Sequence, residues 1–388
     1  MTRVWRALSK RTRARLIAMA LVGLVVIIAV WRARPPSHLT IETGPIGGSY
    51  YAAAQTYQTI LAQRGIDLKL VPKSDTLEIV RDVANPQTGM DIGFIAQDIS
   101  ASRSAPLFSL GQTELQPLFI FANAKLGRRT VLDDLRGRSI VMTPAHSATS
   151  EAATRLFQLY DITKDNTSFT YLPLDEGVKQ LHEGRFDAGA FMLAPENPVV
   201  RSLANDTGLH LVPLLETKAI TDHLPFLRAV VLPRGIYNIA DGIPPVSTPM
   251  VAAPVGIIVR KGLHPYLIYS LLDVLSQVHR GPSFLGDAGE FPTPAGSQLA
   301  VHPLALDYYR SGVPWIYREL PPWLGSAIDR YELLGLGLVV LVVLGLVVIW
   351  LADVVLVIAE RCPPWRRVPS DQPDSSRRPR AVPADARE

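Results

Sequence analysis

The chain has 388 residues, of which 48% are hydrophobic, so it is long enough for two domains that each bury a core. Its basic isoelectric point of about 9.1 comes from the two ends, because residues 1–36 carry eight Lys or Arg and no acid, whereas residues 37–352 carry more acidic than basic side chains. This distribution argues against a nucleic-acid partner, since phosphate recognition requires a clustered basic face.

The first hydrophobic segment follows a basic leader. Residues 1–15 contain six Lys or Arg, and the uncharged run "LIAMALVGLVVIIAVW" follows within residues 16–32. This is the charge pattern of an export signal, but the small residues of a cleavage site are hard to find before "RARPPSH". We therefore predict a cytoplasmic basic segment in residues 1–15 and an uncleaved transmembrane signal anchor in residues 16–32.

From residue 37 onward, short β-like runs alternate with helical patterns. In residues 37–122 the runs "HLTIETG", "IDLKLVP" and "MDIGFIA" each precede a helical or polar segment. The alternation starts again in residues 123–228, where "RSIVMTP" precedes "ATSEAATRLFQLY" and "FDAGAFML" precedes "NPVVRSLAND". Strands that alternate with helices indicate parallel sheets with helical crossovers. We expect the first part of lobe 1 in residues 37–122 and lobe 2 in residues 123–228.

Residues 229–330 contain the β-like run "VAAPVGIIVR" and the helical segment "PYLIYSLLDVLSQVH", and we expect them to return to lobe 1 and add C-terminal helices. Two lobes with more than one crossing strand form a hinge and a cleft. The predicted fold class is α/β, bilobed, with two parallel-rich sheets and a hinge, flanked by one transmembrane helix at each end.

The second hydrophobic segment, residues 333–359, exceeds the roughly 20 apolar residues that cross a bilayer. Arg361, Arg366 and Arg367 follow it, so the positive-inside rule predicts that both chain ends lie in the cytoplasm and that residues 37–330 lie in the periplasm or outside the cell. Residues 360–388 are nearly free of aliphatic side chains and are expected to be a disordered cytoplasmic tail of this inner-membrane protein. The single cysteine, Cys362, falls in that tail, so the exported part has no disulfide.

Candidate ligand-binding residues follow the expected strands. In open parallel sheets, ligands bind beyond the carboxyl ends of the strands. Gly47 and Gly48 allow close approach of the backbone, and the N–H groups of the helix that starts near Ser49 can bind an anion. Small polar residues follow the other strands at Ser74, Asp75, Thr76, Gln97, Asp98, Ser147, Thr149 and Ser150. Ser74 and Thr149 also fit simple N-caps, and Tyr50 also fits a residue that packs its helix on the sheet, so both interpretations stay open.

Four motifs carry a family resemblance. In order over residues 38–312, the segments "ETGPIGGSYYAAAQTYQTIL", "MDIGFIAQDIS", "RFDAGAFMLAPENP" and "HPLALDYYRSG" resemble the TAXI family of solute-binding proteins from TRAP transporters. The resemblance implies a periplasmic-binding-protein-like fold that closes on a small organic anion, an amino acid or a carboxylate, and presents it to TRAP-type membrane permease subunits driven by an ion gradient. By position it implies the ligand-binding residues Gly48, Ser49, Tyr50, Ser74, Gln97, Ser147, Thr149 and Phe191.

The chain departs from the family pattern at two turns. The segment "AHSATS" stands where the family usually has a Gly-Ser-Gly-Thr-like turn, and it brings His146 to the expected cleft. The segment "SDTLE" stands where a glycine pair often occurs, and the carboxylate of Asp75 would suit a ligand with an amino group. A freely diffusing binding protein also has no need of the second membrane segment.

Enzyme motifs are missing from the sequence. None of the eight histidines forms a pair at the helical spacing of a metal site, and the sequence contains neither a Gly-x-Ser-x-Gly elbow nor a lysine-bearing phosphate loop. The segment "GPIGGS" has the wrong glycine spacing for a dinucleotide site. We therefore expect no enzyme activity, metal or cofactor, and we predict a membrane-anchored extracytoplasmic solute-binding protein. The alternative is an extracytoplasmic ligand sensor that signals through its membrane spans.

Overall fold

The computed structural model describes residues 34–96, 98, 105–127, 129–326 and 328–329, together with scattered positions in 20–31 and 337–354. Contacts divide the chain into two compact units, and the unit Ala29–Arg330 holds nearly all of the described residues. The predicted segments 1–15, 16–32, 333–359 and 360–388 lie largely or wholly outside the described residues. Within the described part, no helix is long and apolar enough to cross a membrane.

The first lobe is a parallel sheet covered by helices. Strand β1 (His38–Thr43) pairs in parallel with β2 (Asp67–Pro72) and with β3 (Ile92–Ile95). Helices α3 (Ser49–Gln63) and α4 (Thr76–Ala84) make the crossovers. Buried Ala54, Tyr57 and Leu61 recur at helical spacing on one face of α3, so that face packs on the sheet. The C-terminal helices of this lobe are α9 (Pro265–His279), α10 (Pro303–Ser311) and α11 (Trp315–Arg318).

The second lobe repeats the same plan. Strand β5 (Ser139–Met142) pairs in parallel with β6 (Ser168–Tyr171) and with β7 (Ala188–Met192). Its other elements are α5 (Ala148–Leu159), α6 (Leu174–His182), α7 (Pro198–Asn205), β8 (Leu209–Leu211) and α8 (Thr217–His223). Along β7, Ala190 and Met192 enter one hydrophobic cluster while Phe191 enters another, as expected for a sheet buried on both faces.

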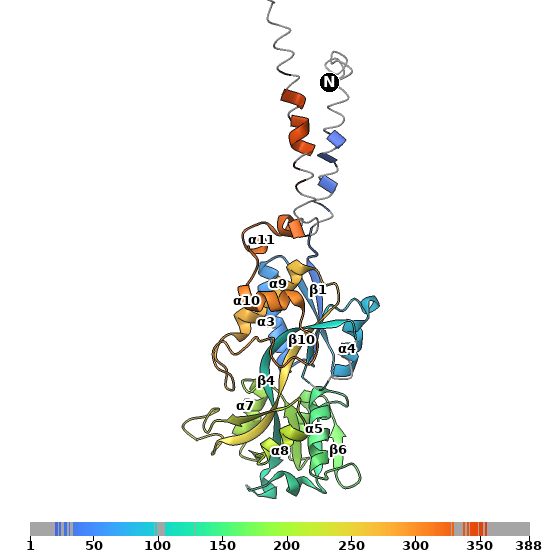
Figure 1. The fold of residues 1–388 in the computed structure, drawn as a ribbon. Coiled ribbons are helices and arrows are strands. Elements are labelled where there is room, and N and C mark those ends of the chain that lie inside the picture. Colours follow the sequence, from blue (N-terminus) through green and yellow to red (C-terminus); the bar gives the residue numbers. More distant parts are fainter. Residues whose placement is uncertain are drawn as a thin grey trace, which may run out of the picture. The chain divides into compact units, whose positions relative to one another are not determined.

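Two long antiparallel strands, β4 (Leu107–Asn123) and β10 (Thr248–Arg260), join the lobes (Figure 1). The first part of β4 pairs with β10, and the residues from Leu118 onward pair with β7 of the second lobe. In β10, residues 256–259 pair with β3 of the first lobe. The β4–β10 ladder contains register shifts between Val255 and Gly256 and between Ile257 and Ile258. Such bulges bend strands, so the crossing is the natural hinge.

The chain changes lobe at different positions from those predicted. The preceding strand β9 (Arg228–Leu232) pairs with residues 248–252 of β10, and Leu232 and Met250 lie in the core of the second lobe with Phe119. Residues 229–250 therefore pack on lobe 2 rather than on lobe 1, because the apolar run at Arg228 forms a hairpin arm of that lobe. The first crossing also occurs inside β4, before residue 122.

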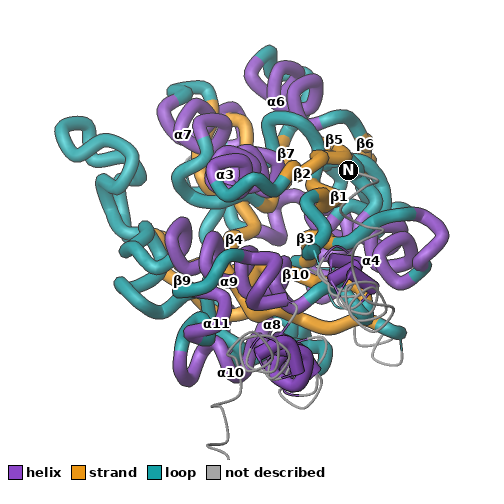
Figure 2. Tube along the Cα trace, turned by 90° about the horizontal axis from the view of Figure 1, so that it is seen from above, coloured by secondary structure: helices purple, strands orange, loops and turns teal. Residues whose placement is uncertain are grey.

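The described residues thus form the bilobed α/β fold that the sequence predicts, but the two parallel groups of strands belong to one continuous ten-stranded sheet rather than to two separate sheets, because β4 and β10 connect them. In the view of Figure 2 the strands lie centrally and the helices surround them. The strand order β2-β1-β3-β10-β4-β7-β5-β6 places the two crossing strands between the two parallel groups. The carboxyl ends of β1, β2, β5 and β7 therefore face each other across the boundary between the lobes.

Candidate functional site

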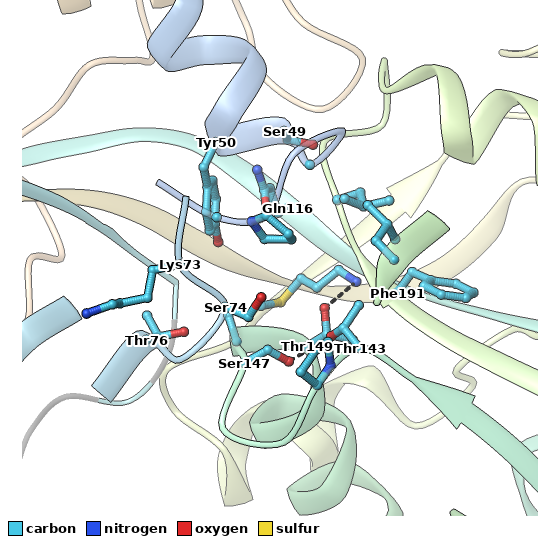
Figure 3. Close-up of a pocket in the computed structure, with 18 of the residues that line it drawn as sticks. Ser49, Tyr50, Lys73, Ser74, Thr76, Gln116, Thr143, Ser147, Thr149 and Phe191 are labelled. Atoms are coloured by element: carbon cyan, nitrogen blue, oxygen red, sulfur yellow. Dashed lines mark hydrogen bonds between the residues drawn. The ribbon is translucent and has the colours of Figure 1, made fainter. Parts of the chain in front are cut away.

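A cavity lies between the lobes at the carboxyl ends of these strands (Figure 3). Its walls combine backbone at tight turns, hydroxyl side chains and apolar side chains. The lining residues are Gly44, Pro45, Gly48, Ser49, Tyr50, Lys73, Ser74, Thr76, Ile79, Gln116, Thr143, Pro144, Ser147, Ala148, Thr149, Leu174, Phe191, Met192 and Leu193. Seven of the eight predicted ligand-binding residues are in this set, and Gln97 lies outside the described residues.

The first-lobe side of the cavity is the glycine turn between β1 and α3. Gly48 N donates to Pro45 O at 3.0 Å, and Gly47 takes a φ of 82°, a conformation that glycine adopts without strain. Gly48 is the N-cap of α3 and supplies no side chain to cap it. A Cβ at Gly48 would lie 2.9 Å from Pro45 O, so the close packing of this turn excludes a side chain. The first N–H groups of α3 therefore have no acceptor in the helix itself.

The second-lobe side is the turn between β5 and α5. Ser147 N donates to Pro144 O at 3.1 Å, and Ser147 is the N-cap of α5. The Ser147 hydroxyl accepts from Ser150 N at 3.2 Å and lies 2.7 Å from the Thr143 hydroxyl. Ser147 therefore caps α5, whereas Thr149, one of the two residues for which an N-cap was an open interpretation, lies inside the helix.

Tyr50 is both a packing residue and a cavity residue. Its ring stacks on Phe94, with ring centroids 5.1 Å apart and planes 4° apart, so it holds α3 on the sheet. Its hydroxyl oxygen is buried, has no hydrogen-bond partner among the described residues, and points into the cavity (Figure 3). Burial raises the pKa of Tyr50 well above its usual value, so the group remains a neutral donor. A buried polar group without a partner costs about 1–3 kcal/mol, which an acceptor on a ligand would recover.

Two predicted hydroxyl residues already have protein partners. Ser49 Oγ accepts from Ala194 N at 2.8 Å and from Asn197 Nδ2 at 3.2 Å, and both partners belong to the second lobe. Thr149 Oγ1 accepts from Met192 N at 3.0 Å. These hydroxyls line the cavity, but their main interactions fasten the lobes together and fix the cavity wall.

The remaining predicted residues differ in how they meet the cavity. Ser74 follows β2 and lines the wall beside Lys73. Phe191 is 1% exposed, and its side chain lies in the core of the second lobe, where it supports one wall of the cavity. Gln116, on the crossing strand β4, was missed because β4 mixes buried polar and apolar residues without a clear period. Its Nε2 donates to Glu114 Oε1 at 2.6 Å, and burial raises the pKa of Glu114 to about 7.

The two turn departures have structural roles. Asp75 is the N-cap of α4 and accepts from Glu78 N at 2.9 Å, and it is not a lining residue. The expectation that its carboxylate faces the ligand is therefore wrong. His146 is also absent from the lining, and its backbone carbonyl accepts from Thr76 N at 3.2 Å, which adds another hydrogen bond between the lobes.

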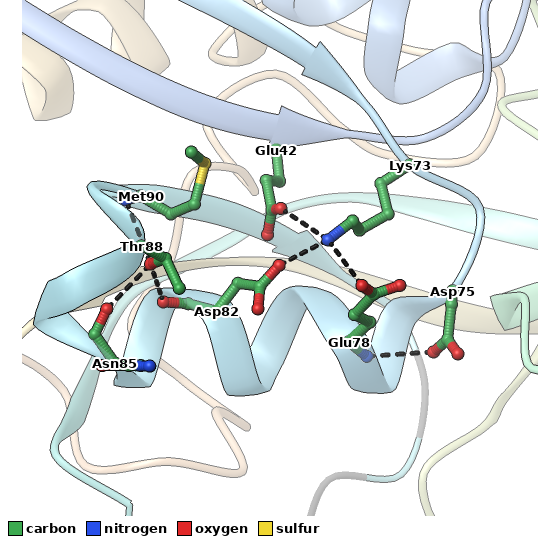
Figure 4. Close-up of polar contacts among 8 residues, drawn as sticks. All are labelled: Glu42, Lys73, Asp75, Glu78, Asp82, Asn85, Thr88 and Met90. Carbon is green, nitrogen blue, oxygen red and sulfur yellow. Dashed lines mark hydrogen bonds and ion pairs between the residues drawn. The ribbon is translucent and has the colours of Figure 1, made fainter.

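Cationic side chains near the cavity are paired with carboxylates. The ammonium of Lys73, the one Lys or Arg among the lining residues in the described part, lies among Glu42, Glu78 and Asp82 (Figure 4). Arg155 Nη1 lies 3.0 Å from Asp98 Oδ2. The cavity thus presents hydroxyls, an amide and helix N-termini. Among the described residues, no group of three or more His, Cys, Asp or Glu is placed to hold a metal ion.

Comparison with known proteins gives one family match. The model of the NMT1-like family matches residues 41–310. No curated protein matches the sequence.

Among solved structures, similarity is found to an amino acid ABC transporter substrate-binding protein from Streptococcus pneumoniae bound to L-arginine (13% identity, 62% of this chain and 89% of that chain, TM-score 0.40). It is also found to the GluR0 ligand-binding core from Nostoc punctiforme with L-glutamate (17%, 63% and 92%, TM-score 0.39). A third is the periplasmic aliphatic sulphonate binding protein from Escherichia coli (13%, 76% and 83%, TM-score 0.41). No ligand or activity follows from similarities of this size.

Proposed function

The chain belongs to the NMT1-like family, and from this premise we propose that it is an extracytoplasmic solute-binding protein that captures a small organic anion between its two lobes. The observation that carries the proposal is the buried Tyr50 hydroxyl, which points into the cavity without a partner among the described residues. It lies beside the uncapped N-terminus of α3. The hydroxyl and the positive end of the α3 dipole together suit a carboxylate.

The strength of such a site is sufficient for solute capture. Hydrogen bonds from neutral donors to a charged group contribute roughly 1.5–3 kcal/mol each. A few of them, with burial of an apolar part of the ligand against Ile79 and Leu174, suffice for affinities in the micromolar range after ordering costs are subtracted.

We propose further that the protein is anchored in the inner membrane and delivers its ligand to a TRAP-type permease. The support is the set of four sequence motifs that resemble the TAXI family, together with the hydrophobic segments 16–32 and 333–359. A single cysteine introduced at Ser247, which is exposed, tests the topology. It should react with an impermeant thiol reagent in intact cells, while Cys362 should react only after lysis. The reverse pattern would contradict the anchored topology.

Native mass spectrometry of the purified full chain tests ligand capture. We expect a co-purified small anion, and calorimetry with that anion should show that Tyr50→Phe weakens binding at least about tenfold, since about 1.4 kcal/mol of hydrogen-bond energy corresponds to that factor. Tyr51→Phe is the matched control, because Tyr51 does not line the cavity. Equal affinities of the two variants would show that the Tyr50 hydroxyl does not bind the ligand and would contradict the proposal.

A further inference from the structure

The cavity has an unusual distribution of charge. Among its described lining residues there is no Asp, Glu, His or Arg, so a ligand ammonium group would find no carboxylate. Lys73 is the one charged lining residue in that set. Its ammonium points away from the cavity centre in Figure 3.

Three carboxylates hold the Lys73 ammonium in that position (Figure 4). Lys73 Nζ lies 3.1 Å from Glu42 Oε1 and 3.1 Å from Glu78 Oε1, and it also bonds to Asp82. Glu78 and Asp82 project from successive turns of α4, and Glu42 projects from β1 immediately before Thr43. The positive charge is more than balanced on the outer side of the cavity wall. A ligand group would therefore have to compete with these three carboxyl groups for it.

Glu42 needs an explanation beyond one ion pair. The residue is 1% exposed, and its second carboxylate oxygen, Oε2, is buried without a hydrogen-bond partner among the described residues. Burial raises the pKa of Glu42 to about 7. A buried carboxylate that is only partly satisfied is costly for folding, so its presence calls for an explanation. Of the three partners, Glu42 alone belongs to a strand of the sheet, so it holds the Lys73 side chain on the side opposite to α4.

The rest of the cavity is suited to an uncharged ligand body. Ile79, Leu174, Met192 and Leu193 line it, together with the rings of Pro45 and Pro144. A second charged group placed against these side chains would lose its hydration without gaining a partner, which is strongly unfavourable.

We infer that the cavity selects a monocarboxylate whose remainder is uncharged and largely apolar, and that Glu42, Glu78 and Asp82 set this preference by withholding the Lys73 ammonium from the ligand. The inference rests on the proposed function and names the ligand class of the same site. It narrows the choice between amino acid and carboxylate, because a zwitterionic amino acid would leave its ammonium group unpaired. A dicarboxylate would leave its second carboxylate unpaired.

Matched probes of equal length test the selectivity. The full chain in nanodiscs is titrated with straight-chain monocarboxylates from propionate to octanoate, with the dicarboxylate of each carbon number, and with the corresponding α-amino acid. In the best-binding set we expect the monocarboxylate to bind at least about tenfold more tightly than its two partners. A dicarboxylate or amino acid that binds as tightly would overturn the inference and leave the proposed function intact. If no probe and no co-purified anion binds, the proposed function itself fails.

A gain of function tests the role of the carboxylates. The double variant Glu42→Gln with Asp82→Asn removes two of the three partners of Lys73, so its ammonium becomes available to the cavity. We expect dicarboxylate affinity to rise about tenfold, and adding Lys73→Met should abolish that rise. Asp222→Asn is the matched control, since it releases the exposed Lys218 far from the cavity and should leave dicarboxylate affinity unchanged. A rise that persists in the triple variant, or no rise in a double variant that melts cooperatively, would overturn the inference.

Discussion

The turn of the first lobe and the turn of the second lobe lead into the cavity on the same backbone plan. Pro45 and Pro144 accept the hydrogen bond that closes each turn, at 3.0 Å and 3.1 Å. The residue before each helix cap has a positive φ, 82° at Gly47 and 65° at His146. Two different sequences, "GPIGGS" and "TPAHSA", therefore produce one geometry. The position at a strand end, rather than the glycine pattern alone, therefore defines a turn that lines the cavity.

The two turns differ in how they treat the donors of their helices. Ser147 uses its hydroxyl to accept from Ser150 N, whereas Gly48 has no side chain and leaves the N-terminus of α3 uncapped. When the two turns are aligned on their prolines, the position of Glu42 in the first lobe corresponds to that of Val141 in the second, and both residues are buried. The first turn thus leaves its helix N-terminus without a side-chain cap and follows a strand that contains an ionisable residue. The second turn caps its own helix and follows a strand with an apolar residue at that position.

Gly48→Val should have the largest effect. Its side chain would clash with Pro45 O and would cover the open N-terminus of α3, so we expect ligand affinity to fall more than about 100-fold. The melting temperature of the ligand-free protein should fall as well, because Pro45 O belongs to the backbone that closes the turn and must shift to admit the side chain. Calorimetry and thermal melting measure the two effects. Unchanged affinity would show that the glycines have a purely structural role and that the two turns do not differ in ligand binding.

Glu42→Val makes the first lobe resemble the second. Because the folded-state pKa of Glu42, about 7, is above its ordinary value of 4.5, the stability that Glu42 contributes is fully present below pH 4.5 and is lost as the pH rises through 7. The wild-type protein should therefore lose stability between about pH 5 and pH 8, and the variant should lose about 2 kcal/mol less over that window. Part of the loss should remain, since Glu114 titrates in the same window. Identical pH profiles from denaturant titrations would contradict the assignment.

Exchanging the positive-φ residues compares the turns directly. Gly47→Ala should destabilise the protein by about 1 kcal/mol, because a Cβ is strained at a φ of 82°. His146→Gly should change stability by less than about 0.5 kcal/mol, since relief of strain in the folded state is offset by greater freedom of the unfolded chain. Denaturant titrations of both variants measure the difference. An equal loss in both would show that the two turns are not equivalent in backbone strain.

Ionic strength should have the smallest effect. If the ligand is held by neutral donors of the first turn, its affinity should change by less than about threefold between low and high salt, because buried contacts are poorly screened. Arg155→Ala should weaken binding less than Tyr50→Phe, since Arg155 pairs with Asp98 outside the cavity lining. Calorimetry over a salt series is the measurement. A steep salt dependence would replace the neutral-donor account with a cationic clamp.

Much of this fold follows from local sequence patterns. The alternation of apolar runs with amphipathic segments predicts β1 through α4 and β5 through α7, because each strand and helix is short and ends at a turn residue. The same logic brings seven predicted residues to one cavity, since strand ends in a parallel sheet meet at one edge. Ligand binding by all eight residues stays a prediction, and the eighth, Gln97, lies outside the described residues.

Other features depend on long-range packing. Strand β4 buries Ser109, Gln112, Thr113 and Gln116 among apolar residues, so its sequence shows no period from which a 17-residue crossing strand could be predicted. The change of lobe at β10 depends on its pairing with β9, which is a tertiary contact. The surroundings of Lys73 also depend in part on long-range packing. Glu78 and Asp82 are spaced for one helix face, but the approach of Glu42 depends on the register between β1 and β2.

The hydrogen bonds that Ser49 makes to Ala194 and Asn197 have a kinetic consequence. They join the cavity wall of one lobe to the other, so a ligand in the cavity leaves only after they break. The opening rate of the lobes then sets a ceiling on the dissociation rate constant, and weak and strong ligands should approach the same maximum in stopped-flow displacement. Ser49→Ala should raise that maximum rate constant by the same factor for every ligand. The residence time of a ligand would then depend on a residue whose hydroxyl bonds to protein groups rather than to the ligand.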